Sequence, residues 1–296
     1  MPKVITVKFI PQEIGPFTWR VVKKTTMEYG YYFDSVMELP FAVTKERHVR
    51  VWLPGSYDFE DEKRYPVIYF SDGQNLVDRH LSAYGDWHLD RVIRDLKDEG
   101  YEEPILVGID CPIDPIERAN ELNPPYRITY RRARKTAPNP YGDKYVNYIA
   151  DELKPLIDSL FKTIPDREHT GIAGSSMGGI MAFWGFLSRP ITFGFALSFS
   201  PPFFFYSKKE LKRICTENAL NPERNGKIFF YVGGKAFEKI FTKKVQWMRE
   251  YFASNGFDAK QMGFAFDKEE VHHEEAWYKY SYPALRFVMD KLPPEE

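Results

Sequence analysis

Short apolar segments alternate with amphipathic stretches along most of the chain, and this alternation restricts the possible folds more than any other feature. Several of the apolar segments are hydrophobic on both faces, as the buried strands of a parallel sheet are. They occur at His48–Leu53, Val67–Phe70, Ile105–Ile109, Thr170–Ala173, Phe195–Phe199, Ile228–Val232 and Gly263–Phe266.

Helical patterns lie between many of these segments. We expect helices over Trp87–Glu99, Lys144–Phe161, Gly178–Ser188, Phe237–Asn255 and Glu274–Leu292, with a kink or break at Pro155. This order predicts an α/β fold with a mostly parallel central sheet and helices on both faces. In such sheets ligands bind at the carboxyl ends of the strands.

The 296 residues contain no internal repeat and no low-complexity linker. We expect residues 41–296 to form the main, catalytic domain. Residues 1–40, with strands at Val4–Phe9 and near Tyr29–Phe33, are expected to form a β-rich extension packed on it.

Composition argues against several classes of partner. Lys and Arg number 41 and Asp and Glu 42, so the formal net charge of −1 does not favour nucleic acid. The sequence has no apolar run long enough to span a bilayer, its first residues do not predict a signal peptide, and its two cysteines suit a reducing compartment. We therefore expect a cytoplasmic protein. The aromatic content of 17% is unusually high and needs an explanation.

The segment Gly174-Ser175-Ser176-Met177-Gly178 follows a predicted buried strand and precedes a predicted helix. This is the context of a nucleophile elbow, in which Ser176 is the nucleophile and the backbone N–H of Met177 faces an oxyanion. The alternatives are a plain glycine-rich turn and a phosphate cradle. A Walker loop at Gly234-Lys235 is excluded, because Phe229 and Ala236 occupy positions that require Gly and Ser or Thr.

A serine nucleophile needs a base, and the only histidines after Ser176 are His272 and His273. They follow the last predicted strand, and chemistry alone does not choose between them. The same cluster also suits a solvated helix start or a partial metal site, although the sequence shows no second set of metal ligands. After the strand Val67–Phe70, the backbone N–H of Gln74 is the expected second oxyanion donor; the alternative is an ordinary Asp-Gly turn.

Three separated motifs together resemble the "putative esterase" branch of the α/β-hydrolases, over about residues 40–292. That branch includes enterochelin (siderophore) esterases, feruloyl and acetyl-xylan esterases, S-formylglutathione hydrolases and mycolyltransferases. The motifs are Tyr65–Asn75, the stretch from Asp151 through Gly179, and His272-x-Glu274-x-x-Trp277. The resemblance implies an α/β-hydrolase fold and ester chemistry through Ser176.

The resemblance also favours His272 as the base and Gln74 as the oxyanion donor. It departs at the acid, because Ala236 stands where the family often has a carboxylate. Glu238 is the nearest substitute and Asp267 a less favoured one. A Ser–His pair without a strong acid, as the resemblance suggests for some enterochelin-type members, is a third possibility.

For the substrate site we expect Phe203 and Phe204, from the loop after Phe195–Phe199, together with Trp87 and Arg127, which belongs to a basic patch reaching Lys135. Each also has a purely structural interpretation, as core packing or a solvated charge. The predicted function is a serine carboxylic-ester hydrolase without cofactor or metal, acting on a small-molecule or oligosaccharide ester. Bulky, partly aromatic esters of siderophore or hydroxycinnamoyl type are favoured, and acetylated carbohydrate comes next. An acyltransferase and a catalytically silent binding protein are the alternatives, and the sequence predicts no oligomeric state.

Overall fold

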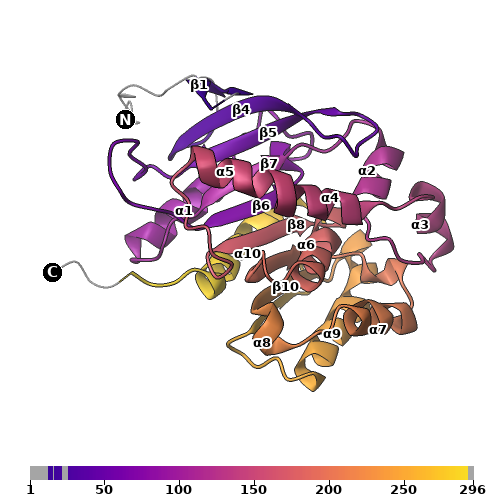
Figure 1. Ribbon diagram of the computed structural model, residues 1–296. Coiled ribbons are helices and arrows are strands. Elements are labelled where there is room, and N and C mark those ends of the chain that lie inside the picture. Colours follow the sequence, from indigo (N-terminus) through magenta and orange to yellow (C-terminus); the bar gives the residue numbers. More distant parts are fainter. Residues whose placement is uncertain (1–12, 16, 22–25, 293–296) are drawn as a thin grey trace.

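A computed structural model describes residues 13–15, 17–21 and 26–292 of the chain. A nine-stranded sheet runs through its centre in the order β11-β10-β9-β8-β6-β7-β5-β4-β3, with helices on both sides (Figure 1). The predicted α/β fold with a mostly parallel central sheet is therefore confirmed.

The strands from β6 to β11 are parallel to one another, whereas β5 runs antiparallel to β7 and to β4, and β3 antiparallel to β4. A separate two-stranded sheet joins β1 and β2. The bounds are β1 Glu13–Ile14, β2 Phe17–Thr18, β3 Arg20–Val21, β4 Tyr31–Glu38, β5 Glu46–Leu53, β6 Val67–Ser71, β7 Ile105–Ile109, β8 Thr170–Ser175, β9 Phe195–Phe199, β10 Lys227–Gly233 and β11 Met262–Asp267.

The longer helices connect the parallel strands, and shorter ones lie in the loops. Their bounds are α1 Leu89–Asp98, α2 Pro115–Glu121, α3 Arg131–Thr136, α4 Gly142–Tyr148, α5 Lys154–Leu160, α6 Met177–Ser188, α7 Lys208–Glu217, α8 Pro222–Asn225, α9 Lys239–Ser254 and α10 Glu274–Val288. The 3₁₀ turns are η1 Gly73–Asn75, η3 Phe203–Phe205 and η4 Ala236–Glu238. In the described parts of the chain, no helix is both long and apolar enough to cross a bilayer.

Two hydrophobic cores lie on opposite faces of the sheet, because alternate side chains of a strand point to opposite faces. On β6, Val67 and Tyr69 belong to the core that α4, α6 and α9 cover. Ile68 and Phe70 belong to the other core, with residues of α1 and α10. Much of the aromatic content is used here, since many fully buried side chains are Phe, Tyr or Trp.

The break predicted at Pro155 takes the form of a π-helical turn, η2 (Ile149–Leu153), which lies between α4 and α5. Proline has no backbone N–H to donate, so a wider turn before it accommodates the unpaired carbonyl. The expected C-terminal helix ends earlier than predicted, at Val288, and the short helices α2, α3, α7 and α8 were not predicted.

The predicted strand Val4–Phe9 lies outside the described residues. The strand near Tyr29–Phe33 is longer than expected, and as β4 it pairs along its whole length with β5 in the central sheet. The division into an extension (1–40) and a catalytic domain (41–296) stays a prediction.

Phe183 on α6 provides a test of the larger core, because it is fully buried and its ring packs against Phe203, Phe230 and Phe252. We expect Phe183→Ala to lower the free energy of unfolding by about 3–5 kcal/mol, measured by urea denaturation. The exposed Ile191 is the control, and Ile191→Ala is expected to change it by less than about 0.5 kcal/mol. Similar urea midpoints for the two variants would contradict this packing.

Candidate active site

The carboxyl edge of the sheet carries a cavity of about 670 Å³. Both Ser176, which follows β8, and His272, which follows β11, line it. The other lining residues are Arg50, Asp72, Gln74, Asn75, Leu81, Ala83, Tyr84, Asp110, Cys111, Pro112, Ile113, Pro115, Arg118, Ser175, His273, Glu274 and Trp277. The predicted location at the strand ends is where these chemically active side chains meet.

Ser176 occupies a sharp turn between β8 and α6, with φ 52° and ψ −122°. A non-glycine residue adopts positive φ only when its surroundings enforce it. Strand and helix approach so closely that a Cβ on Gly174 would lie 2.7 Å from the backbone carbonyl of Gly178, and one on Gly179 would lie 2.5 Å from the carbonyl oxygen of Phe199. The glycines around Ser176 therefore have a steric reason, as a nucleophile elbow requires.

His272 is joined through Nδ1 to the carboxylate of Glu238. Glu238 is fully buried and also accepts hydrogen bonds from the Ser200 hydroxyl, at 2.5 Å, and from the Gly233 N–H, at 3.0 Å. Trp277 in turn donates from Nε1 to Ser200 Oγ at 3.0 Å. A buried carboxylate with several donors is held in one position, and its hydrogen bond to Nδ1 leaves Nε2 of His272 as the free ring nitrogen.

The alternatives that the sequence left open are arranged differently. His273 caps α10, its Nδ1 accepting from the Glu275 N–H at 3.3 Å. Asp267 binds Lys279 at 2.9 Å and the Tyr280 hydroxyl at 2.8 Å, and these hydrogen bonds lower its pKa to about 2. The structure thus joins Glu238, not Asp267, to a histidine of this cavity.

Aromatic rings surround the His272 imidazole. Phe241 stacks on it with ring centroids 4.6 Å apart, and Phe237 and Trp277 meet it edge-on at 5.6 Å and 5.0 Å. Phe237 is 59% exposed, so one side of the histidine is bordered by an open aromatic surface.

Both residues predicted to donate to the oxyanion lie at the carboxyl edge of the sheet, where Ser176 also lies. Met177 is the first residue of α6, and the N–H groups of a helix's first turn have no partner within the helix. Gln74 lies in η1, directly after β6. Among the described backbone hydrogen bonds outside regular elements, none is donated by Met177 or Gln74.

Two ion pairs, each with one buried residue and one partly buried residue, line the same cavity. Arg118 on α2 binds both carboxylate oxygens of Asp72, at 2.8 and 2.7 Å, and Arg50 binds both oxygens of Asp110, at 2.7 Å each. Burial raises the pKa of Asp110, although its Arg50 partner opposes this shift. Both arginines of the wall are therefore already paired with carboxylates.

Burial also raises the pKa of the Cys111 thiol to about 12, with the Asp72 carboxylate adding to the shift. Cys111 is thus a neutral thiol at physiological pH and not a nucleophile. Glu274, at the start of α10, has its pKa raised by burial too.

The four side chains predicted to contact substrate do not line this cavity. Trp87 and Phe203 are buried: Trp87 packs on Phe70, Phe199 and Trp277, and Phe203 belongs to the core under α6. Phe204 contacts Phe241, one layer behind His272. Arg127 lies on an exposed loop outside the cavity wall. Trp87 and Phe203 therefore have a structural role, because their rings pack in the two cores.

Sequence reasoning missed the residues that line the cavity from the loops after β6 and β7. Tyr84, Ile113 and Arg118 lie in irregular or short helical segments, without periodicity that marks a face. Ser200 begins the loop after β9, which the sequence analysis considered only for Phe203 and Phe204. Its φ of 46° directly after β9, which resembles that of Ser176 after β8, is visible only in the structure.

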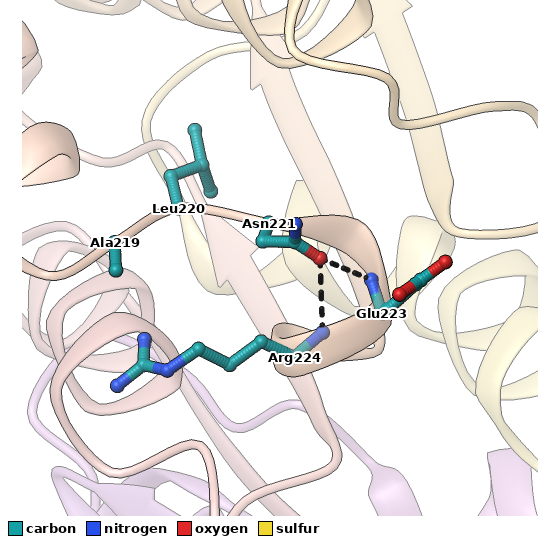
Figure 2. A pocket seen from close by; sticks show the side chains of 5 residues that line it. All are labelled: Ala219, Leu220, Asn221, Glu223 and Arg224. Atoms are coloured by element: carbon teal, nitrogen blue, oxygen red, sulfur yellow. Dashed lines mark hydrogen bonds between the residues drawn. The ribbon is translucent and has the colours of Figure 1, made fainter.

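Two other features lie apart from this cavity. Figure 2 shows a hollow lined by residues 219–224 other than Pro222, where Asn221 Oδ1 accepts from the N–H groups of Glu223 and Arg224 and so caps α8. Glu102, His169 and Asp290 are potential metal ligands whose donor atoms all lie within 4.8 Å of one another. No other set of three or more His, Cys, Asp or Glu side chains in the described part of the chain has this arrangement. It lies near the amino ends of β7 and β8, so it is not part of the Ser176 site.

Residues 42–289 match the sequence family described as "Putative esterase". The chain belongs to this family. It is 23% identical over 251 residues to the uncharacterized protein YbbA of Bacillus subtilis, a match that spans 83% of this chain and 93% of that protein.

Solved structures agree with this fold. A ferulic acid esterase aligns with a TM-score of 0.63 at 19% identity, over 87% of this chain and 97% of its own. The ferric enterobactin esterase of Salmonella typhimurium aligns with a TM-score of 0.64 at 19% identity, over 87% of this chain and 57% of its own. At such identities the likeness establishes a shared α/β-hydrolase fold, in a chain that belongs to an esterase family.

Proposed function

We propose that this esterase-family protein is a serine carboxylic-ester hydrolase that works through an acyl-enzyme. One observation carries the proposal: a serine in strained elbow geometry shares a cavity with a histidine whose Nδ1 is bound by a buried carboxylate. This combination is the nucleophile, base and orienting acid of serine hydrolysis.

In the proposed first step, Ser176 Oγ attacks the ester carbonyl carbon while His272 Nε2 takes the hydroxyl proton. Glu238 keeps the proton of His272 on Nδ1 and stabilises the imidazolium that forms. The N–H groups of Met177 and Gln74 donate to the carbonyl oxygen as it becomes negative. The tetrahedral intermediate collapses, the C–O bond to the alcohol breaks, and His272 gives the alcohol its proton.

In the second step water attacks the acyl-serine ester and loses its proton to His272. The acid leaves, and Ser176 recovers its hydroxyl proton from the imidazolium. An alcohol in place of water gives acyl transfer by the same route, so product ratios with added alcohols distinguish the two reactions. A catalytically silent binding protein is the alternative, since Ala236 stands where the family often has a carboxylate; the contact between Glu238 and His272 argues against it.

For substrate we propose bulky, partly aromatic esters of siderophore or hydroxycinnamoyl type. Support comes from the apolar portion of the cavity wall, formed by Leu81, Ala83, Tyr84 and Ile113, and from the exposed ring of Phe237 beside His272. Aligned structures that carry the names ferulic acid esterase and ferric enterobactin esterase support the same classes.

The nucleophile is tested by labelling with a fluorophosphonate probe followed by intact-mass analysis. We expect the wild-type protein to gain one adduct and Ser176→Ala to gain none, because the probe forms a bond to an activated serine. The neighbouring hydroxyl provides the control, and Ser175→Ala is expected to keep the label. Equal labelling of Ser176→Ala would assign the nucleophile elsewhere.

The acid is tested by replacing Glu238 with its neutral isostere. Glu238→Gln is expected to lower kcat/KM by about 10²- to 10⁴-fold, because the amide neither fixes the histidine tautomer nor stabilises the imidazolium. Asp267→Asn is the matched control, since Asp267 is the other carboxylate considered and lies in a separate ion-pair cluster. We expect it to retain turnover, and unchanged turnover in Glu238→Gln would remove that residue from the mechanism.

A panel of esters tests the substrate class. Methyl hydroxycinnamate and a catecholate trilactone are expected to give higher kcat/KM than acetylated sugars, because only the aryl esters bury apolar area against the wall. A p-nitrophenyl ester serves as the reference for intrinsic activity. The highest kcat/KM for an acetylated sugar would overturn the preference for bulky aromatic esters while leaving the serine mechanism in place.

A further inference from the structure

Asp72 directly follows β6 and adopts the left-handed conformation, with φ 59° and ψ 50°. Aspartate tolerates this region, often by hydrogen bonding to its own backbone. Here, however, the side chain makes no cap for η1. Both of its oxygens instead accept from Arg118, Nε at 2.8 Å and Nη2 at 2.7 Å. The conformation of this residue is thus tied to a side chain 46 positions away in the chain.

The rest of the loop, Gly73 to Asn75, is held from another side. A Cβ on Gly73 would lie 2.6 Å from the backbone of Gly108 on β7, so the two main chains are in contact. The side chain of Gln74 makes two hydrogen bonds to Cys111. Its Nε2 donates to Cys111 Sγ at 3.2 Å, and its Oε1 accepts from the Cys111 N–H at 3.2 Å. These contacts hold the loop against β7 and Cys111. Its attachment to α2 is the ion pair between Asp72 and Arg118.

We propose that Arg118 is a positioning residue for the esterase reaction: through its two hydrogen bonds to Asp72, it sets the direction of the Gln74 N–H toward the oxyanion. This inference rests on the proposed function, because it assumes that Gln74 donates to a tetrahedral intermediate. Arg118 acts through the loop and touches no reacting atom.

A second consequence of the pair is electrostatic. A Cβ at Gly178, in the first turn of α6, would lie 3.4 Å from Asp72 Oδ2, so the carboxylate lies close to the helix end behind Ser176. Arg118 neutralises this charge. Without Arg118, the buried carboxylate of Asp72 would be unpaired. Its desolvation would destabilise the folded loop, and its negative charge would repel the oxyanion of the transition state.

The test compares Arg118→Met with Arg47→Met. Arg47 is a matched control, because it forms a two-pronged buried pair with Glu121 on the same helix, at 3.1 Å for each contact, and does not line the cavity. We expect Arg118→Met to lower kcat for a p-nitrophenyl ester by about 10²-fold with little change in KM, the pattern of an interaction made only in the transition state. The affinity for an aryl boronate, which forms a tetrahedral serine adduct, is expected to fall with kcat.

Arg47→Met is expected to lower Tm at least as much as Arg118→Met while keeping kcat. Arg118→Lys is expected to restore only part of kcat, because an ammonium cannot reproduce the guanidinium fork. If Arg118→Met and Arg47→Met lower kcat equally, or if KM alone changes, the positioning role is wrong.

The double variant Asp72→Asn with Arg118→Met keeps the proposal testable if the single variant folds poorly. It removes both charges, so Tm is expected to recover while kcat stays low, since nothing then orients the loop. Recovery of kcat together with Tm would show a merely structural pair. If the wild-type protein shows no Ser176-dependent labelling, the proposed function itself is wrong. If labelling is normal but Arg118→Met remains fully active, only the positioning role of Arg118 is wrong.

Discussion

The buried carboxylate of Glu238 is the point on which the carboxyl edge of the sheet depends. A buried charge is tolerated only when hydrogen-bond donors surround it. The donors to Glu238 are Ser200 in the loop after β9, Gly233 at the end of β10 and His272 in the loop before α10. Trp277 extends the network through Ser200 into α10. One carboxylate therefore holds three segments in register and orients His272 at the same time.

Strained backbone repeats along the same edge. Asp72, Ser176, Ser200 and Ala236 each have positive φ, and each lies just beyond the end of a parallel strand, β6, β8, β9 or β10. Such conformations persist where the surrounding contacts determine them more strongly than local preference does. At Ala236 the consequence is direct: the chain turns into η4 and brings Glu238 back toward His272. The residue that departs from the family pattern begins the turn that delivers the carboxylate.

The elements that the sequence predicted well are those whose signal is local. The strands from Val67 to Phe266 are short apolar runs, and the turn at Ser176 combines glycine spacing with a strand before it and a helix after it. Less was predictable where a residue's environment comes from elsewhere. Trp87 and Phe203 were expected near substrate, yet packing against Phe199 and Phe183 places them in the cores. Local sequence does not say which of many aromatic rings a core will take up.

By itself the sequence determined the α/β order of elements, the serine at the strand–helix turn and the histidine loop after the last strand, because these follow from periodicity and from sterics between near neighbours. Only the tertiary structure decided the partners. Glu238 meets His272 across 34 positions and Asp72 meets Arg118 across 46, and both contacts exist because neighbouring strands bring their following loops to one edge. The physical reason is that a buried charge needs a partner at a specific point in space, and sequence separation carries no information about that point.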